Sequence, residues 1–322
     1  MLCIPNAFSS QNYAQQLQRL STDEGLSQNY VEKIQEDEIG YIWIATQQGL
    51  NRFDGYTVKT FDGGFELDKH YIFTLLKTND GKLLVSTDIA GAYLIDPQTL
   101  KTEKIYSGQL DKETQVYSPV SAMAGQNELY HLAIDNQIFT YNKTTGAFTE
   151  TAAITNKTSY IRALTLHNNT LYIGANDGLY ALNLANNQLT EVPLHSAQQI
   201  TVDNINVKFL QVDKELGLLV GTVEGLYRFA FLNDNHSLSS KITTLIPDLN
   251  IWDYISSDHG DFVATEKGLF SFNRTNGEIE LTLNYENSKF NINDNTISDL
   301  TISQTGVLWL SSRSQGVFTW PI

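Results

Sequence analysis

The sequence predicts an all-β protein folded as a single seven-bladed β-propeller. The first observation is a repeat: each copy has two apolar strands joined by a Gly or Asn turn, a third strand rich in Leu, Phe and Tyr, and a more polar fourth strand. The second is its spacing, because the first turns recur every 41 to 48 residues, a length typical of a four-stranded blade. The third is composition: 16 Tyr and 15 Phe against only 6 Pro suit many strands joined by short turns.

The turns between the first and second strands define the seven copies. They fall at Gly40, Gly81, Asn127, Asn169, Gly217, Gly260 and Gly306. Gly and Asn are expected there because a tight hairpin needs a residue that tolerates positive φ. A second column follows the second strand, at Gly49, Gly91, Gly178, Gly225, Gly268 and Gly316, and only the third copy differs, with Asn136 and Gln137. We expect the same backbone cause for this column and assign it no catalytic role.

The seventh copy ends after its third strand, which leaves the outer edge of its sheet open. Residues 17–20 (Leu-Gln-Arg-Leu) alternate like an outer strand and have no inner partner of their own. We therefore expect this N-terminal strand to close the last blade, so that residues 15–322 form one propeller. Residues 1–14 are then a tail, either the remnant of a signal peptide or an ordinary N-terminus, since the first basic residue is Arg19.

Charge and motifs narrow the function. Lys and Arg total 21 against 36 Asp and Glu, a net charge of −15 that disfavours nucleic acid and anionic membranes as partners. No apolar run is long enough to cross a bilayer, so any link to a membrane requires a segment absent from this sequence. Cys3 is the only cysteine, and no zinc, nucleotide or nucleophile-elbow motif occurs, so we expect no cofactor and no metal.

The first copy resembles the two-component regulator propeller repeat. The resemblance runs from Leu26-Ser-Gln-Asn-Tyr-Val31 through Trp43-Ile-Ala-Thr46 to Gly49-Leu-Asn-Arg-Phe-Asp-Gly55. The second, fourth, sixth and seventh copies match less closely and the third and fifth more weakly, so the resemblance covers nearly the whole chain. It implies the periplasmic or otherwise extracytoplasmic sensing region of a bacterial receptor, joined through a membrane helix to a histidine kinase or a diguanylate cyclase. Many such receptors also carry a second propeller and a β-sandwich, so seven repeats alone fit a fragment, a truncated product or a free-standing propeller.

Aligned inner strands predict a candidate site in the central channel. One position, mostly polar, is occupied by Glu32, Phe73, Ser121, Arg162, Lys208, Asp253 and Ser298. Charged side chains there are expected to face the channel, because unpaired burial between sheets is costly. The same alignment places Trp252 in the column of Val31, where it is expected to belong to the core, as are Trp43 and Trp309 in their second strands.

Loops on the same face of the ring are expected to add Tyr30, His70, Tyr71, Tyr160 and Arg313 to the four charged channel residues. Aromatic rings beside mixed charges suit an oligosaccharide or another small polar molecule. The alternative is that all these residues are ordinary turn residues around a water-filled channel with internal ion pairs.

We expect a non-enzymatic sensor that binds an extracellular ligand and signals by changing how two copies pack, as a homodimer. A propeller enzyme of the lyase or glycosidase type remains open, because its catalytic residues would come from separate blades and leave no linear motif. Glu32, His70, Tyr71 and Arg162 form the set for that alternative. A protein–protein interaction platform is the third possibility, and it differs from the other two by needing no concave pocket.

Overall fold

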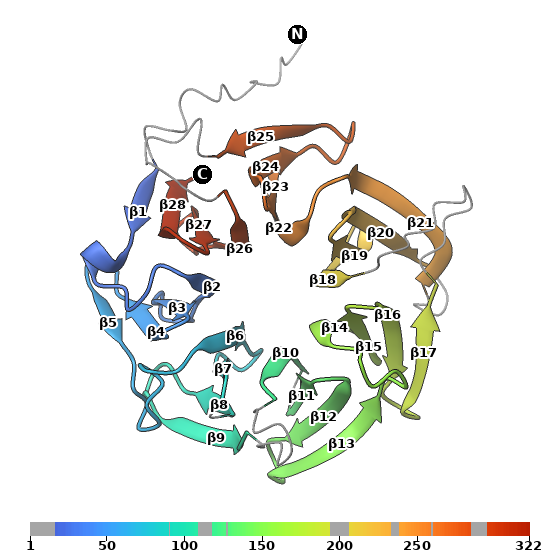
Figure 1. The fold of residues 1–322 in the computed structure, drawn as a ribbon, viewed down its shortest axis with the longest axis horizontal. Coiled ribbons are helices and arrows are strands. Elements are labelled where there is room, and N and C mark those ends of the chain that lie inside the picture. Colours follow the sequence, from blue (N-terminus) through green and yellow to red (C-terminus); the bar gives the residue numbers. More distant parts are fainter. Residues whose placement is uncertain are drawn as a thin grey trace.

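The computed structural model describes residues 17–89, 91–108, 118–126, 128–193, 206–232, 238–258, 260–284 and 295–322. These residues form seven four-stranded antiparallel sheets, which are arranged as blades around a central channel (Figure 1). The prediction of an all-β, seven-bladed propeller is confirmed. Within the described ranges the one helical element is a short 3-10 helix, η1 (Thr22–Glu24), and no helix there has the length and apolarity needed to cross a membrane.

In each of the first six blades, four consecutive strands run from the channel to the rim. Blade 1 contains β2 (Val31–Glu36), β3 (Ile42–Thr46), β4 (Gly49–Phe53) and β5 (Val58–Thr60). Blade 2 contains β6 (Ile72–Lys77), β7 (Leu83–Thr87), β8 (Ala92–Ile95) and β9 (Thr102–Tyr106). Blade 3 contains β10 (Val120–Gln126), β11 (Leu129–Ile134), β12 (Gln137–Asn142) and β13 (Ala147–Ala153).

The remaining blades follow the same order until the last. Blade 4 contains β14 (Ile161–His167), β15 (Thr170–Ala175), β16 (Gly178–Asn183) and β17 (Gln188–Val192). Blade 5 contains β18 (Val207–Asp213), β19 (Gly217–Thr222), β20 (Gly225–Phe231) and β21 (Leu238–Pro247). Blade 6 contains β22 (Ile251–Ser257), β23 (Gly260–Thr265), β24 (Gly268–Phe272) and β25 (Ile279–Leu283). Blade 7 contains β26 (Ile297–Ile302), β27 (Val307–Ser312), β28 (Gly316–Pro321) and β1 (Gln18–Leu20).

The N-terminal strand closes the ring, as the sequence predicts. Strand β1 pairs antiparallel with β28, with Gln18 opposite Thr319 and Leu20 opposite Val317. Leu17, directly before β1, is only 2% exposed and packs among residues of blades 6 and 7. The strand therefore covers the open edge of β28 and adds a side chain to the neighbouring core.

The hydrophobic core lies between blades. The buried apolar residues form seven clusters, and each cluster combines side chains from two adjacent blades. Trp43 and Trp309 are buried in two of them, as expected from their second-strand positions. The Trp43 indole also donates to Asp37 Oδ2 at 2.7 Å, which satisfies its buried N–H. Because each face of a blade is covered only by its neighbour, the ring depends on closure for its stability.

The glycine column after the second strand has two physical causes. At Gly49, φ is +119°, and a Cβ would lie 2.4 Å from the carbonyl oxygen of Asp68. Positive φ also occurs at Gly91, Gly225, Gly268 and Gly316. The expected backbone cause is wrong for Gly178, whose φ is not positive. The turn between the first and second strands of blade 4 also differs from the prediction, because Asn168 and not Asn169 has positive φ there. The predicted turn at Asn127 lies outside the described residues.

Each inner strand carries a β-bulge at its second residue. The pairing with the second strand shifts there in all seven blades, which leaves one residue per blade out of the ladder. These bulge residues are Glu32, Phe73, Ser121, Arg162, Lys208, Trp252 and Ser298. A bulge re-aims the side chain of its extra residue, and here it supplies one side chain per blade to the channel.

The sixth blade corrects the sequence alignment by one residue. Ile251 pairs with Thr265 and Asp253 with Ala264, so Trp252 occupies the bulge that Glu32 occupies in blade 1. The prediction that Trp252 is a core residue in the column of Val31 is therefore wrong. Two consecutive apolar residues, Ile251 and Trp252, fit the first inner position equally well in the sequence, and strand pairing selects Ile251.

Candidate functional site

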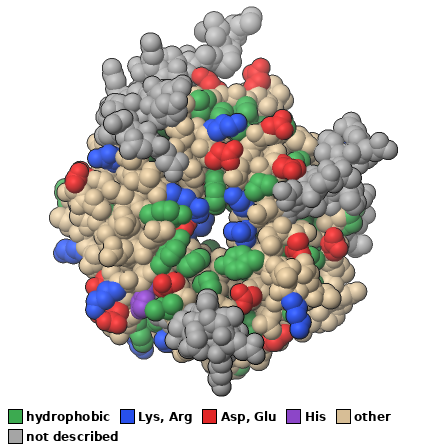
Figure 2. Space-filling view, in the orientation of Figure 1, with side chains coloured by type: hydrophobic (Ala, Val, Ile, Leu, Met, Phe, Trp, Pro, Cys, Tyr) green, Lys and Arg blue, Asp and Glu red, His purple; other side chains and the backbone are tan. Residues whose placement is uncertain are grey.

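The seven bulge residues line a cavity of about 380 Å³ in the central channel. The space-filling view shows the channel opening at the centre of the ring, with Lys and Arg side chains beside it (Figure 2). The volume is at the lower end of the range of about 300–1,000 Å³ typical of small-molecule sites. We use the name channel mouth for Tyr30, Glu32, Tyr71, Phe73, Tyr160, Arg162, Lys208, Trp252 and Arg313.

Glu32 organises one side of the channel mouth. The Tyr71 hydroxyl donates to Glu32 Oε1 in a short hydrogen bond, and Arg313 Nη2 lies 3.0 Å from Glu32 Oε2. The Glu32 side chain is only 13% exposed, so these contacts replace most of its water. Burial, followed by the Glu32 charge, raises the pKa of Tyr71, which keeps its hydroxyl protonated as a donor. Three blades meet at this carboxylate.

Trp252 holds two cations. Lys208 Nζ lies 3.6 Å from the centre of the indole and Arg313 Cζ lies 4.0 Å from it, both over the ring. Arg313 also lies over the Tyr30 ring, at 5.4 Å. The aromatic faces attract these cations through the ring quadrupole. The Trp252 indole N–H and Arg313 Nε are buried with no hydrogen-bond partner among the described atoms, which leaves two donors that a water or a ligand atom would satisfy.

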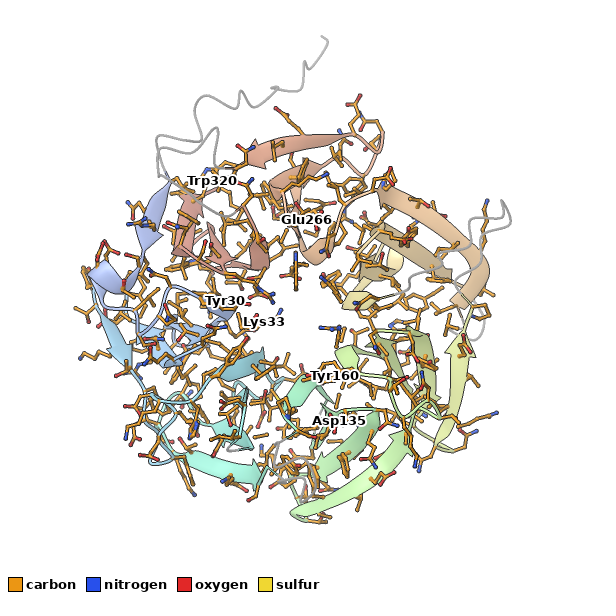
Figure 3. All side chains as sticks on the ribbon, in the orientation of Figure 1. Tyr30, Lys33, Asp135, Tyr160, Glu266 and Trp320 are labelled. Carbon is orange, nitrogen blue, oxygen red and sulfur yellow. The ribbon has the colours of Figure 1, made fainter. Side chains whose placement is uncertain are left out.

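Arg162 and Lys208 lie at the channel mouth on the adjacent blades 4 and 5. Arg162 is exposed and lies 5.3 Å from the centre of the Tyr160 ring (Tyr160 is labelled in Figure 3). The pKa of Lys208 is lowered to about 8, first by burial and then by repulsion from Arg162 and Arg313, against an attraction from Glu266. This repulsion shows that the three cations lie close enough to interact.

His70 lies apart from this group. Its Nδ1 is 3.6 Å from Asp88 Oδ1, too far for a hydrogen bond, and it is not among the residues that line the channel cavity. The structure thus brings together Glu32, Tyr71 and Arg313 from the predicted set, with Tyr30 beside them, but does not add His70. Of the residues proposed for the enzyme alternative, Tyr71 and Glu32 are in contact, with Tyr71 as the proton donor and Glu32 as the acceptor.

Asp253 lies one position beyond the bulge, together with Lys33 and Asp299. Asp253 Oδ2 accepts from the Leu300 backbone N–H at 2.8 Å, and Asp299 Oδ2 accepts from the Ile34 N–H at 2.7 Å. Lys33 Nζ lies 2.6 Å from Asp299 Oδ1. Asp253 was expected in the column of Glu32, and that alignment is wrong by one residue. Asp253 still lines the channel cavity, as expected, and it also ties blade 6 to blade 7.

Burial dominates the electrostatics of this carboxylate pair. Burial, followed by the Asp299 charge, raises the pKa of Asp253 to about 7. Burial also raises the pKa of Asp299. Although burial acts to lower it, the pKa of Lys33 is raised by Asp299 and Asp253. One lysine thus compensates two carboxyl groups, and the pair carries less than two full negative charges near neutral pH.

In the described part of the chain, no three His, Cys, Asp or Glu side chains are grouped as a metal site would require. His131, which is 3% exposed, places Nδ1 2.9 Å from the Thr140 hydroxyl. Burial lowers the pKa of His131 to about 4, so it is neutral at physiological pH and acts as a core residue.

Sequence reasoning missed Trp252, Lys33 and Asp299 as channel residues. The available signal was the position of each residue within its inner strand. The second residue of each strand faces the channel, and the charged third residues of blades 1, 6 and 7 line the channel and also contact a neighbouring blade. Reading that signal requires the bulge, because a regular strand would place the second and fourth residues on the same side.

Comparisons with known proteins agree with the fold. No family model matches the chain. A protein named histidine kinase P4 from Formosa agariphila is 50% identical over 38 residues, which make up 12% of this chain and 3% of that protein. The match is local, so it identifies a similar segment and not a shared architecture.

Among the solved propellers similar to the chain are structures of two kinds of protein. One kind is represented by two extracellular domains from B. thetaiotaomicron. That of the putative hybrid two-component system BT3049 has a TM-score of 0.73 and 18% identity, covering 96% of this chain and 42% of that chain. The domain of the putative one-component system BT4673 has a TM-score of 0.76 and 18% identity, and the match covers 95% of this chain and 40% of that chain. The chain thus spans less than half the length of these domains.

The other kind is an enzyme. A streptogramin B lyase has a TM-score of 0.69 and 13% identity, covering 94% of this chain and 96% of that chain. At such identities the likeness establishes the fold alone, and the fold serves both extracellular receptor domains and a lyase.

Proposed function

We propose that this propeller is the extracytoplasmic sensing domain of a bacterial membrane-linked receptor of the two-component type, and that it binds a small polar molecule at the channel mouth. The likeness to two extracellular receptor domains and the short match to a histidine kinase support this assignment. Binding changes how two copies of the propeller pack, and the packing passes the signal to an output domain across the membrane.

The observation that carries this proposal is the construction of the channel mouth. Its side chains come from six blades, and strand bulges direct one residue per blade into a cavity of small-molecule size. A ligand in contact with Glu32, Lys208 and Trp252 would touch blades 1, 5 and 6 at once. Such a ligand couples blades that are far apart in the sequence, as a sensor requires.

The test is a binding screen with purified protein. Saccharides, amino acids and organic acids are screened by thermal shift, because a ligand that binds only the native state raises Tm. For any compound that binds, Glu32→Gln and Arg313→Met should each weaken Kd by at least about tenfold, since both remove a charge that orders the mouth. Lys101→Met, at an exposed lysine on the rim, is the matched control and should bind like the parent protein.

The remaining outcomes decide between the alternatives. Turnover of a bound compound, lost in Tyr71→Phe, would favour an enzyme that uses the Glu32–Tyr71 pair. Unchanged binding in both mouth variants would place the ligand elsewhere and refute this site. Light scattering with and without ligand tests the second step, in which ligand binding shifts the monomer–dimer equilibrium.

A further inference from the structure

The channel mouth concentrates positive charge on a protein whose net charge is −15. Among the residues of the channel mouth, the charged side chains are the three cations Arg162, Lys208 and Arg313 and the carboxylate Glu32. Lys33, Asp253 and Asp299 line the same cavity one residue further along their strands, so four cations and three carboxyl groups line it in all. Figure 2 shows Lys and Arg side chains on both sides of the opening. Acidic residues outnumber basic ones by 15 over the whole chain, so this local excess is opposite in sign to the protein.

The three cations are not equivalent. Arg313 is neutralised, because its guanidinium lies 3.0 Å from the buried Glu32 carboxylate. Arg162 and Lys208 have no carboxylate within ion-pair distance among the described residues and instead lie over the rings of Tyr160 and Trp252. Glu266 attracts Lys208 from a greater distance. Aromatic rings hold a cation in position without neutralising its charge. Two positive groups are therefore fixed in orientation and available at the rim of one cavity.

This arrangement disfavours the charged form of Lys208. Lys208 is partly buried and repelled by Arg162 and Arg313, and together with burial this lowers its pKa to about 8. Groups whose ionisation is disfavoured in this way are enriched at functional sites, where a ligand offsets the unfavourable field. An anion between Arg162 and Lys208 would screen their repulsion and supply the missing counter-charge.

We propose that the channel mouth recognises an oxyanion group, a carboxylate, sulfate or phosphate on a small molecule, through Arg162 and Lys208. This inference rests on the proposed ligand site and specifies its chemistry. Glu32 holds Arg313 against Trp252, which in turn positions Lys208. The cavity volume of about 380 Å³ suits a small molecule or one terminal unit of a longer one.

The test compares matched charged and neutral probes by titration calorimetry at pH 7. D-glucuronate is paired with D-glucose, and sulfate and phosphate ions test the other two oxyanions. At least one of the three anions should bind, and a uronate-binding site should prefer glucuronate to glucose by at least about tenfold. Lys208→Met and Arg162→Gln should each weaken anion binding by at least about tenfold, while Lys59→Met, at an exposed lysine on β5, should leave it unchanged.

Proton linkage gives a second readout that a purely structural lysine would not produce. An anion beside Lys208 raises its pKa from about 8, so at pH 8 anion binding should take up a fraction of a proton. The uptake appears as a difference in binding heat between two buffers of different ionisation enthalpy. It should be absent in Lys208→Met.

Three results would overturn the oxyanion assignment. They are the absence of binding by glucuronate, sulfate and phosphate at millimolar concentration, equal affinity for glucuronate and glucose with neither ion bound, and unchanged anion affinity in both cation variants. The broader proposal of a ligand site at the channel mouth is tested separately. A neutral ligand whose affinity falls in Glu32→Gln and Arg313→Met would refute the oxyanion specificity and support the ligand site.

Discussion

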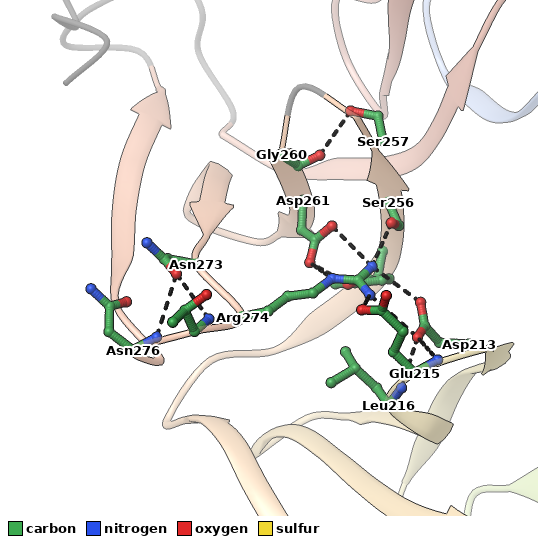
Figure 4. Close-up of polar contacts among 12 residues, drawn as sticks. Asp213, Glu215, Leu216, Ser256, Ser257, Gly260, Asp261, Asn273, Arg274 and Asn276 are labelled. Atoms are coloured by element: carbon green, nitrogen blue, oxygen red, sulfur yellow. Dashed lines mark hydrogen bonds and ion pairs between the residues drawn. The ribbon is translucent and has the colours of Figure 1, made fainter. Parts of the chain in front are cut away.

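Arg274 connects blades 5 and 6 at the end of the inner strands away from the channel mouth (Figure 4). Its guanidinium binds Asp261 of blade 6 through Nε and Nη2, and its Nη2 also lies 3.1 Å from Asp213 Oδ2 of blade 5. The side chains of Asp261 and Asp213 are 4% and 9% exposed. The Tyr254 hydroxyl donates to Asp261 at 2.6 Å. One cation thus compensates two buried carboxylates on different blades.

Arg274→Met is expected to lower the free energy of unfolding by about 3–5 kcal/mol, because it leaves buried carboxylates without their counter-charge. Urea denaturation at pH 7 measures this loss. Glu215→Gln is the control: Glu215 also contacts Arg274, at 3.0 Å, but its side chain is 77% exposed. That substitution should cost no more than about 1 kcal/mol. Equal losses in the two variants would show that burial does not govern this cluster.

The inner strand is the element that determines how far the sequence could predict the site. Repeat spacing predicts the seven blades, and the aligned strands correctly place Glu32, Arg162 and Lys208 at the channel, since all three line its cavity. The alignment fails at Trp252 and Asp253, because an apolar residue at a bulge has the same pattern as an apolar residue in the ladder. The contacts among Glu32, Tyr71 and Arg313 could not be predicted from the sequence, because they join residues of three different blades.

Strand β1 permits a prediction about ring closure. Deleting residues 1–20 removes β1 and Leu17, which exposes the edge of β28 and opens the core between blades 6 and 7. Loss of Leu17 burial alone is worth about 1.5–3 kcal/mol. The truncated protein should melt at a lower temperature and associate with increasing concentration, because a free strand edge pairs with other chains.

The control for this truncation is a deletion of residues 1–14, the segment predicted from the sequence to be a tail. It should retain the parental Tm and the parental association state in light scattering. A normal Tm after removal of residues 1–20 would show that β1 is dispensable for closure.

At the scale of the whole ring, the last blade differs from the others because it joins the two ends of the chain. Both of its inner-strand interfaces carry a buried carboxylate tie. Asp253 of blade 6 accepts from Leu300 of blade 7, and Asp299 of blade 7 accepts from Ile34 of blade 1. At the equivalent position the other described blades have Lys33, Thr74, Ala122, Ala163 and Phe209. At this position of the inner strand, acidic ties between the described blades therefore occur only at the two interfaces of blade 7.

This placement makes ring stability depend on pH. Between its ordinary pKa of 3.8 and the raised value of about 7, Asp253 binds more protons in the folded than in the unfolded state. Its contribution to stability is therefore present at low pH and is lost as pH rises through this window. The physical cause is first the burial of the Asp253 carboxyl group and then the negative charge of Asp299 beside it, which Lys33 compensates only in part.

Asp253→Asn should remove this loss, so that the variant gains stability relative to the parent as pH rises from about 4 to about 7. Denaturant unfolding at several pH values measures the difference. Asp96→Asn should behave differently: the Thr99 backbone N–H and Lys82 lower the pKa of Asp96 to about 2, so its stabilising contribution is lost only as pH falls from about 4 towards 2. A parallel pH profile for Asp253→Asn and the parent between pH 4 and 7 would mean that Asp253 stays ionised when folded, with Lys33 strong enough to neutralise both carboxylates.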